Sequence, residues 1–140
     1  MTIKEIQEEI IEEFSMFDDW MERYEYIIEL GKSLPLIDDN YKLDENLIKG
    51  CQSKVWLHSE IVDDKINFTA DSDAILTKGI VALLLRVFNN QKPKAILEAD
   101  LYFIDEIGLK EHLSPTRANG LVSMIKQIKL YALAFQSKLS

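Results

Sequence analysis

Hydrophobic side chains in the first thirty residues recur at the three- and four-residue spacing of two amphipathic helices. Thr2 and Glu5 have the spacing of a capping box, so we expect the first helix to begin there. The second helix is predicted from about Asp18 to Leu30, with Gly31 in the left-handed conformation at its end and Pro35 preventing continuation. We expect these two helices to pack antiparallel.

The period changes to two between residues 55 and 70, which is typical of strands with one buried face. Apolar and polar side chains alternate on both sides of Asp63-Asp64, so the pattern predicts an antiparallel hairpin with its turn at these residues. The preceding segment from Leu36 to Gly50 is poorly periodic. Only Tyr41 and Leu43 indicate a short strand within it.

The remainder of the chain is predicted to be helical, with breaks at polar clusters. Asp71-Ser72-Asp73 can cap the most apolar stretch, which we expect to form a buried central helix. Pro93 can begin a short helix, and the residues from there to His112 have the composition of connected turns. Ser114 as N-cap and Pro115 at the first helical position predict the start of a long final helix.

These elements together predict one α+β domain over residues 1–140, with helices packed around a small antiparallel sheet. With 47% hydrophobic residues, a chain of 140 residues can bury a core without disulfides or metals. No apolar run reaches the roughly 18 residues that a membrane span requires. The N-terminus lacks the features of a signal peptide, and a single cysteine suits a reducing compartment, so we expect a cytoplasmic protein without membrane partners.

The net charge of −8, from 24 acidic and 16 basic residues, makes nucleic acid an unexpected partner. For most of the acidic residues, solubility is a sufficient explanation. An acidic face can also orient a protein partner.

Cys51 is the residue with the clearest capacity for chemistry. It lies between the poorly periodic segment and the first strand, where we expect a loop, and loops held by a rigid scaffold often bear reactive groups. Gly50 permits a sharp turn or a close backbone approach, and Lys49 and Lys54 would favour the thiolate if either turned toward the sulfur. By itself, however, a lone cysteine is more often a small buried hydrophobic residue than a nucleophile.

Metal and cofactor chemistry lack the required residues in the sequence. One cysteine with two distant histidines, His58 and His112, gives no recognisable set of metal ligands, and no glycine-rich phosphate loop follows a strand. We therefore expect neither a metal nor a cofactor. Either histidine folding toward Cys51 would supply the base of a cysteine hydrolase, but a sheet-surface position for His58 and a turn position for His112 are the stronger interpretations.

Arg117 and Asp73 have both a functional and a structural interpretation. Arg117 falls near the third position of the final helix, where the positive end of the macrodipole disfavours a cation, and such a local conflict can mark function. A surface ion pair explains it equally well. A helix cap explains Asp73. Gly120 in the final helix indicates close packing of another backbone.

Four segments, in this order along the chain, resemble segments of the SufE family. They are Gly50-Cys51-Gln52-Ser53-Lys54-Val55-Trp56-Leu57, Ala70-Asp71-Ser72-Asp73-Ala74 together with Gly79, Gly108-Leu109, and His112-Leu113-Ser114-Pro115-Thr116-Arg117-Ala118-Asn119-Gly120-Leu121. The cysteine segment and the Ser-Pro-x-Arg-x-Asn-Gly-Leu segment, at this separation, are the specific part of the resemblance. The linker 89–93 departs from the small turn expected there.

The resemblance implies an α+β fold similar to that of the IscU scaffold proteins and a role in iron–sulfur cluster assembly. Cys51 matches the cysteine that accepts sulfur as a persulfide, by a displacement much like thiol–disulfide exchange. Gly50, Gln52 and Ser53 would shape its loop, which the family holds shielded in a hydrophobic pocket. Asp73 and Arg117 would support that loop or a docking face.

The partners that the resemblance implies are a SufS-like cysteine desulfurase, which the chain would stimulate, and a SufBCD-like scaffold complex, which would receive the sulfur. A Csd-type system shares the same motifs. The pyridoxal phosphate that extracts sulfur belongs to the desulfurase. The chain would then be a sulfurtransferase-type persulfide carrier rather than an independent enzyme.

Two other functions are compatible with the sequence. In the first, the chain is a binding module that activates or anchors a desulfurase while Cys51 is merely buried. In the second, it is an independent thiol enzyme, a hydrolase or a peroxidase, although the peroxidase form lacks a resolving cysteine.

Overall fold

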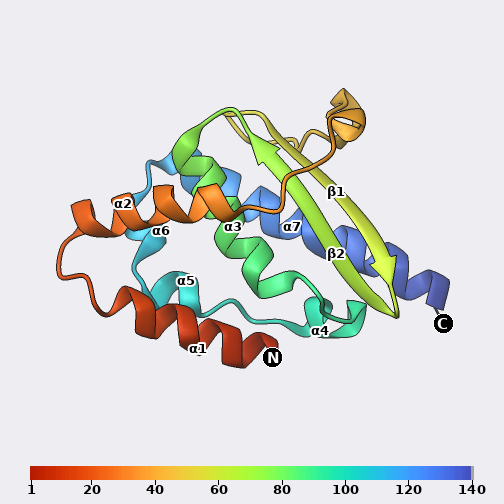
Figure 1. The fold of residues 1–140 in the computed structure, drawn as a ribbon, viewed down its shortest axis with the longest axis horizontal. Helices are drawn as coiled ribbons and strands as arrows, with labels where there is room; N and C mark the ends of the chain where they lie inside the picture. Colours follow the sequence, from red (N-terminus) through yellow and green to blue (C-terminus); the bar gives the residue numbers. More distant parts are fainter. Residues whose placement is uncertain (140) are drawn as a thin grey trace.

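Helix α3 (Ile75–Phe88) forms the centre of the computed structural model, which describes residues 1–139 (Figure 1). Ten of its 14 residues are buried, as expected of a helix that is apolar on all sides. Helices α1 (Ile3–Phe14) and α2 (Trp20–Leu30), the β hairpin and the long helix α7 (Pro115–Leu139) surround it. The predicted α+β class and the predicted central helix are confirmed.

The two N-terminal helices run in opposite directions (Figure 1), and the predicted capping box is present between Thr2 and Glu5. The predicted left-handed conformation of Gly31 is wrong, because its φ is −59° and it begins a 3-10 turn, Gly31–Ser33. A Cβ on Gly31 would lie 3.1 Å from the backbone nitrogen of Gly79 in α3. Glycine is therefore required at this position by close packing against α3, and not by a positive φ angle at the end of α2.

The hairpin consists of β1 (Val55–Val62) and β2 (Lys65–Ser72), paired antiparallel as predicted. Asp63 and Asp64 have positive φ angles of 52° and 67°, which matches a two-residue type I′ turn. The inward-facing residues of the two strands pack on α3; those that are fully buried are Val55, Leu57, Ile66, Phe68 and Ala70.

The short strand predicted at Tyr41 and Leu43 is wrong. This segment forms two 3-10 turns, Asp39–Tyr41 and Asp44–Asn46, and crosses the end of the hairpin without joining the sheet as a strand. Backbone hydrogen bonds tie the two ends of the segment to the hairpin, from Ile37 to Ala70 at 3.0 Å and from Ile48 to Val55 at 2.9 Å. Between them, Lys42 forms an ion pair with Asp71 of β2 at 2.6 Å.

Three short helices lead from α3 to α7: α4 (Pro93–Glu98), α5 (Phe103–Glu106) and α6 (Leu109–His112). The last two are single helical turns where the sequence predicted only connected turns. Ser114 caps α7 as predicted, since its Oγ accepts a hydrogen bond from the backbone nitrogen of Arg117 at 3.3 Å.

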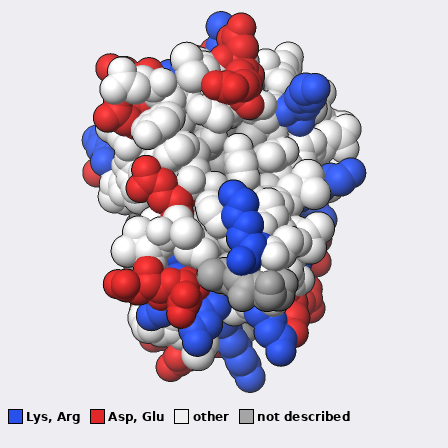
Figure 2. Space-filling model, turned by 90° about the vertical axis from the view of Figure 1, so that its right-hand side faces the viewer, with Lys and Arg blue, Asp and Glu red and all other residues white. Residues whose placement is uncertain are grey.

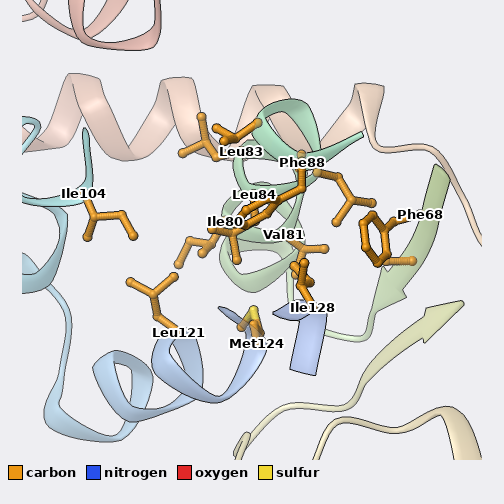
Figure 3. Close-up of a cluster of buried hydrophobic side chains, with 14 of the residues drawn as sticks. Phe68, Ile80, Val81, Leu83, Leu84, Phe88, Ile104, Leu121, Met124 and Ile128 are labelled. Carbon is orange, nitrogen blue, oxygen red and sulfur yellow. The ribbon is translucent and has the colours of Figure 1, made fainter. Parts of the chain in front are cut away.

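The core joins the N-terminal half of α7 to α3, as Figure 3 shows. Ile80 and Leu84 of α3 lie opposite Leu121 and Met124 of α7, and each of these four side chains is at most 3% exposed. This contact fixes the position of the first turns of α7, on which the candidate site depends.

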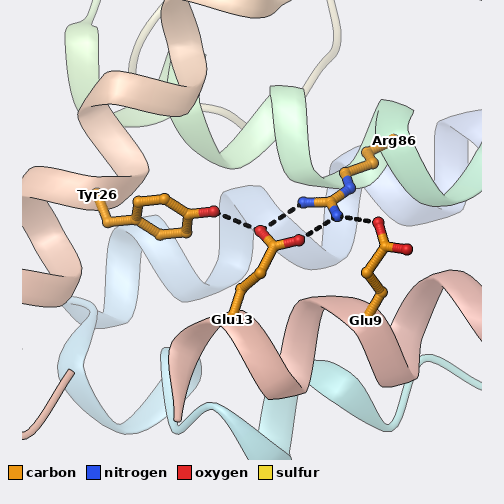
Figure 4. Close-up of polar contacts among 4 residues, drawn as sticks. All are labelled: Glu9, Glu13, Tyr26 and Arg86. Atoms are coloured by element: carbon orange, nitrogen blue, oxygen red, sulfur yellow. Dashed lines mark hydrogen bonds and ion pairs between the residues drawn. The ribbon is translucent and has the colours of Figure 1, made fainter. Parts of the chain in front are cut away.

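An ion cluster joins α1, α2 and α3 near the surface (Figure 4). Arg86 of α3 donates to Glu9 at 2.5 Å and to Glu13 at 2.9 Å, and the hydroxyl of Tyr26 also donates to Glu13. The hydrogen bond from Arg86 lowers the pKa of Glu13. Burial, together with the bond to Glu13, raises the pKa of Tyr26 to about 12.

The surface carries charges of both signs. On the face shown in Figure 2, acidic and basic side chains both occur around uncharged surface. Within residues 1–139, no helix combines the length and apolarity that a membrane span requires.

Candidate functional site

Cys51 lies on a loop that passes across the N-terminal half of α7, and Gly50 makes this path possible. Gly50 has a φ of +91°, a conformation that side chains rarely adopt. A Cβ on Gly50 would also lie 2.5 Å from the Oγ atom of Ser123 in α7. The sharp turn and the close backbone approach expected at Gly50 are both present, so the loop tolerates no larger residue here without moving.

Gly120 of α7 receives the cysteine. A Cβ on Gly120 would lie 3.6 Å from the Sγ atom of Cys51 and 3.8 Å from its Cα, so the loop rests directly on the helix. The thiol points at the Gly120 carbonyl, with Sγ 3.6 Å from the oxygen. The backbone that Gly120 was predicted to accommodate is therefore that of Cys51 itself.

Asp73 fixes the other end of the loop, and its predicted role as a helix cap is wrong. The N-cap of α3 is Ala74, without a side-chain cap. Asp73 Oδ1 instead accepts a hydrogen bond from the backbone nitrogen of Lys54 at 3.0 Å, and the Asp73 nitrogen donates to the Lys54 carbonyl at 3.3 Å. The Asp73 carboxylate is therefore used to tie the cysteine loop to the end of β2, and not to cap α3.

A small hollow lies beside the sulfur, with a volume of about 20 Å³. This is close to the roughly 10–15 Å³ that a cavity needs to hold one water molecule. The hollow lies where the loop meets α3 and α7. Its lining residues are Cys51, Gln52 and Ser53 from the loop, Thr77 and Ile80 from α3, and Thr116, Arg117, Gly120 and Met124 from α7.

The thiol is half-buried, and burial raises the pKa of Cys51 above its ordinary value. Lys49 and Lys54 do not offset this effect, since burial is the sole cause of the shift among the described residues. Arg117 lies at the rim with an exposed side chain, and within residues 1–139 no ion pair or side-chain hydrogen bond involves its guanidinium. The resting thiol is therefore mainly protonated at neutral pH.

Neither histidine lines the hollow. His58 stacks on Tyr41 with ring centroids 3.8 Å apart, and His112 stacks on Trp20 at 3.9 Å. Both therefore have the structural positions that the sequence favoured, on the sheet surface and before the last helix. Among the residues that line the hollow, there is no histidine to act as the base of a hydrolase.

A family model described as "SufE: Fe-S metabolism associated domain" matches residues 8–132. The chain belongs to the SufE family. It is therefore associated with iron–sulfur metabolism, as the resemblance in the sequence indicated.

Relatives with names of the same kind match most of the chain. An uncharacterized SufE-like protein of Rhizobium meliloti is 42% identical over 127 residues, which cover 87% of this chain and 91% of that protein. Another from Synechocystis is 38% identical over 127 residues, covering 91% and 80%. The solution structure of a hypothetical protein from Thermus thermophilus has a TM-score of 0.78 at 19% identity, over 94% of this chain and 96% of that one, and supports the fold alone.

In this SufE-family chain, the structure brings Cys51, Gln52, Ser53 and Arg117 together around one hollow, although Arg117 is far from the others in sequence. Gly50 and Asp73 lie outside the hollow and determine the path of the loop. Sequence reasoning missed the contributions of Thr77 and Thr116. The available signal for Thr77 was a polar side chain inside the most apolar helix.

Proposed function

We propose that Cys51 accepts sulfane sulfur as a persulfide from a SufS-like cysteine desulfurase and delivers it to a SufBCD-like scaffold for iron–sulfur cluster assembly. The observation that best supports this is the position of the chain's one cysteine, on a loop at the surface and beside a hollow of about one atom's size. A purely structural cysteine needs neither that hollow nor a glycine at positive φ before it.

The proposed step exchanges one sulfur–sulfur bond for another. The Cys51 thiolate attacks the outer sulfur of a persulfide on the desulfurase, a bond forms between Sγ and that sulfur, and the desulfurase cysteine leaves as a thiolate. The product is a persulfide on Cys51, and no external oxidant or reductant is consumed. The pyridoxal phosphate that releases sulfur from free cysteine belongs to the desulfurase in this proposal.

Partner docking would activate the thiol. Because burial raises the pKa of Cys51, the free protein keeps the sulfur mainly protonated and slow to react. Docking that moves the loop, or that places a positive charge beside it, would increase the thiolate fraction. Arg117, with Gln52 and Ser53, lies around the sulfur where a docking surface would meet it. The reaction needs a reducing compartment, which fits a cytoplasmic location.

The decisive experiment is the intact mass of the protein after incubation with a cysteine desulfurase and free cysteine. We expect a gain of one sulfur that a reductant removes, together with faster desulfurase turnover, and neither effect with Cys51→Ser. Absence of the mass gain with SufS-like and Csd-type desulfurases would overturn the proposal.

A binding module that activates a desulfurase without carrying sulfur is the second candidate, and the raised pKa of the Cys51 thiol is the observation in its favour. It predicts that Cys51→Ser stimulates the desulfurase as well as the unaltered protein does. Turnover measured with this variant therefore distinguishes the two functions.

A further inference from the structure

Thr77 is a buried polar residue without a visible structural purpose. Its exposure is 5%, and within residues 1–139 its hydroxyl has no hydrogen bond. Gln7 of α1 is the other buried polar residue within residues 1–139, and both ends of its amide are hydrogen-bonded. Its Nε2 donates to the Asp100 carbonyl at 3.0 Å, and its Oε1 accepts from the Phe103 nitrogen at 3.1 Å. No fully buried side-chain oxygen or nitrogen among residues 1–139 lacks a partner, so the unbonded Thr77 hydroxyl oxygen keeps a small contact with solvent although the residue as a whole is buried.

The position of Thr77 relates its hydroxyl to the cysteine site. It lies one turn before Ile80 on α3, and residues three apart share a face of a helix. Ile80 faces Leu121 and Met124 of α7 in Figure 3, and Thr77 lines the hollow beside Cys51 together with Ile80 and Met124. Thr77, the one hydroxyl-bearing residue of α3, thus lies at the place where the sulfur would be loaded.

The resting thiol does not use this hydroxyl. The hydrogen bond of the Cys51 sulfur within the described chain is to the Gly120 carbonyl, at 3.6 Å. A persulfide extends the side chain by one sulfur, about 2.05 Å beyond Sγ, which is the length of a sulfur–sulfur bond. The hollow of about 20 Å³ has room for one atom of that size.

We propose that the Thr77 hydroxyl donates a hydrogen bond to the outer sulfur of a persulfide on Cys51. This hydrogen bond would be present in the loaded protein and absent from the resting one. This inference rests on the proposed function. When Cys51–S–SH loses its proton to solvent, the hydroxyl stabilises the resulting anion Cys51–S–S⁻. Arg117 is the one charged side chain among the described lining residues, and it remains the same in all the variants below.

The test uses chemically loaded protein, so that it needs no desulfurase. Inorganic polysulfide loads Cys51 by the same displacement: the thiolate attacks the terminal sulfur, and a polysulfide one atom shorter leaves. Measurement of intact mass identifies the protein that carries one added sulfur. The rate of alkylation of this persulfide by iodoacetamide is then followed across a range of pH. We expect Thr77→Val to need a higher pH for half-maximal rate and to react about fivefold more slowly at acidic pH, the ratio that one hydrogen bond supplies.

Controls separate the hydroxyl from the space it fills. Thr77→Ser keeps the hydroxyl and should retain the unaltered profile, whereas Thr77→Ala should match the valine variant. The unloaded thiol should show one pH profile in all four proteins, because its hydrogen bond within the described chain is to the Gly120 carbonyl and not to Thr77. The melting temperature of Thr77→Val should be close to that of the unaltered protein, since the substitution keeps the side-chain volume and breaks no hydrogen bond within the described chain.

Three outcomes would overturn the inference: loaded Thr77→Val that titrates like the unaltered protein, a serine variant that fails to retain its profile, or equal changes in loaded and unloaded protein. Failure of desulfurases to load Cys51 would instead contradict the proposed function and leave this measurement intact.

Discussion

Two arginines show how the same side chain serves different purposes in this molecule. Arg86 lies between α1 and α3 with its guanidinium bound by Glu9 and Glu13, and its side chain is 28% exposed. Arg117 is exposed at the rim of the cysteine hollow, and in the described chain its guanidinium has no such pair. A satisfied charge of the first kind holds helices together. An unsatisfied one of the second kind is available to a partner.

The largest effect expected from this difference is on stability. Arg86→Ala would leave two carboxylates facing each other at a partly buried contact, and we expect a loss of about 3 kcal/mol in the free energy of unfolding. Urea denaturation measures it. Stimulation of a desulfurase per folded molecule should remain unchanged, and a loss of stimulation would show that Arg86 also acts at the site.

The acid dependence of stability should report on the same cluster. Arg86 lowers the pKa of Glu13 below its ordinary 4.5, so the stabilising ion pair is present above that pH and is lost as the pH falls through the lower, folded value. Glu13→Gln should cost about 2 kcal/mol at neutral pH, because it removes a hydrogen bond to a charged group. Urea unfolding at a series of pH values should show a smaller acid loss for this variant. Parallel curves would contradict the assignment.

The smallest expected change in energy is at Arg117. Arg117→Ala should alter the free energy of unfolding by less than about 0.5 kcal/mol, as for an exposed residue without partners. The stimulation of a desulfurase by this variant should be about tenfold weaker than that by the unaltered protein, which corresponds to a loss of about 1.4 kcal/mol in the free energy of binding to the desulfurase. Arg117→Lys, which keeps the charge but not the planar fork, is the matched control. Full stimulation by the alanine variant would remove Arg117 from the docking surface.

Features specified by neighbouring residues were predictable from the sequence. The capping box at Thr2, the hairpin turn at Asp63-Asp64 and the start of α7 at Ser114 each depend on residues within a few positions. The errors at Gly31 and Asp73 arose because distant partners decided their roles. Gly31 meets the backbone of α3, and Asp73 binds Lys54 across the hairpin.

The candidate site follows the same rule. Cys51 and Gly50 could be identified locally, since a glycine before a cysteine in a loop is visible in the sequence. The meeting of Cys51 with Arg117 was expected only from the family resemblance, because 66 positions separate the two residues (117 minus 51). Thr77 was missed because its meaning depends on an empty space, which only the packing of α3 against α7 and the loop creates.

The size of the hollow has a consequence for stoichiometry. With room for about one atom, it would hold the first sulfur added to Cys51, and the second and later atoms of a longer chain would extend beyond it. Sulfur atoms beyond the hollow would be exposed to cellular thiols, which would remove them by thiol–disulfide exchange. In the proposed function, each docking of this protein to the scaffold would therefore deliver a single sulfur atom. A cluster would be assembled by adding one sulfur atom at a time.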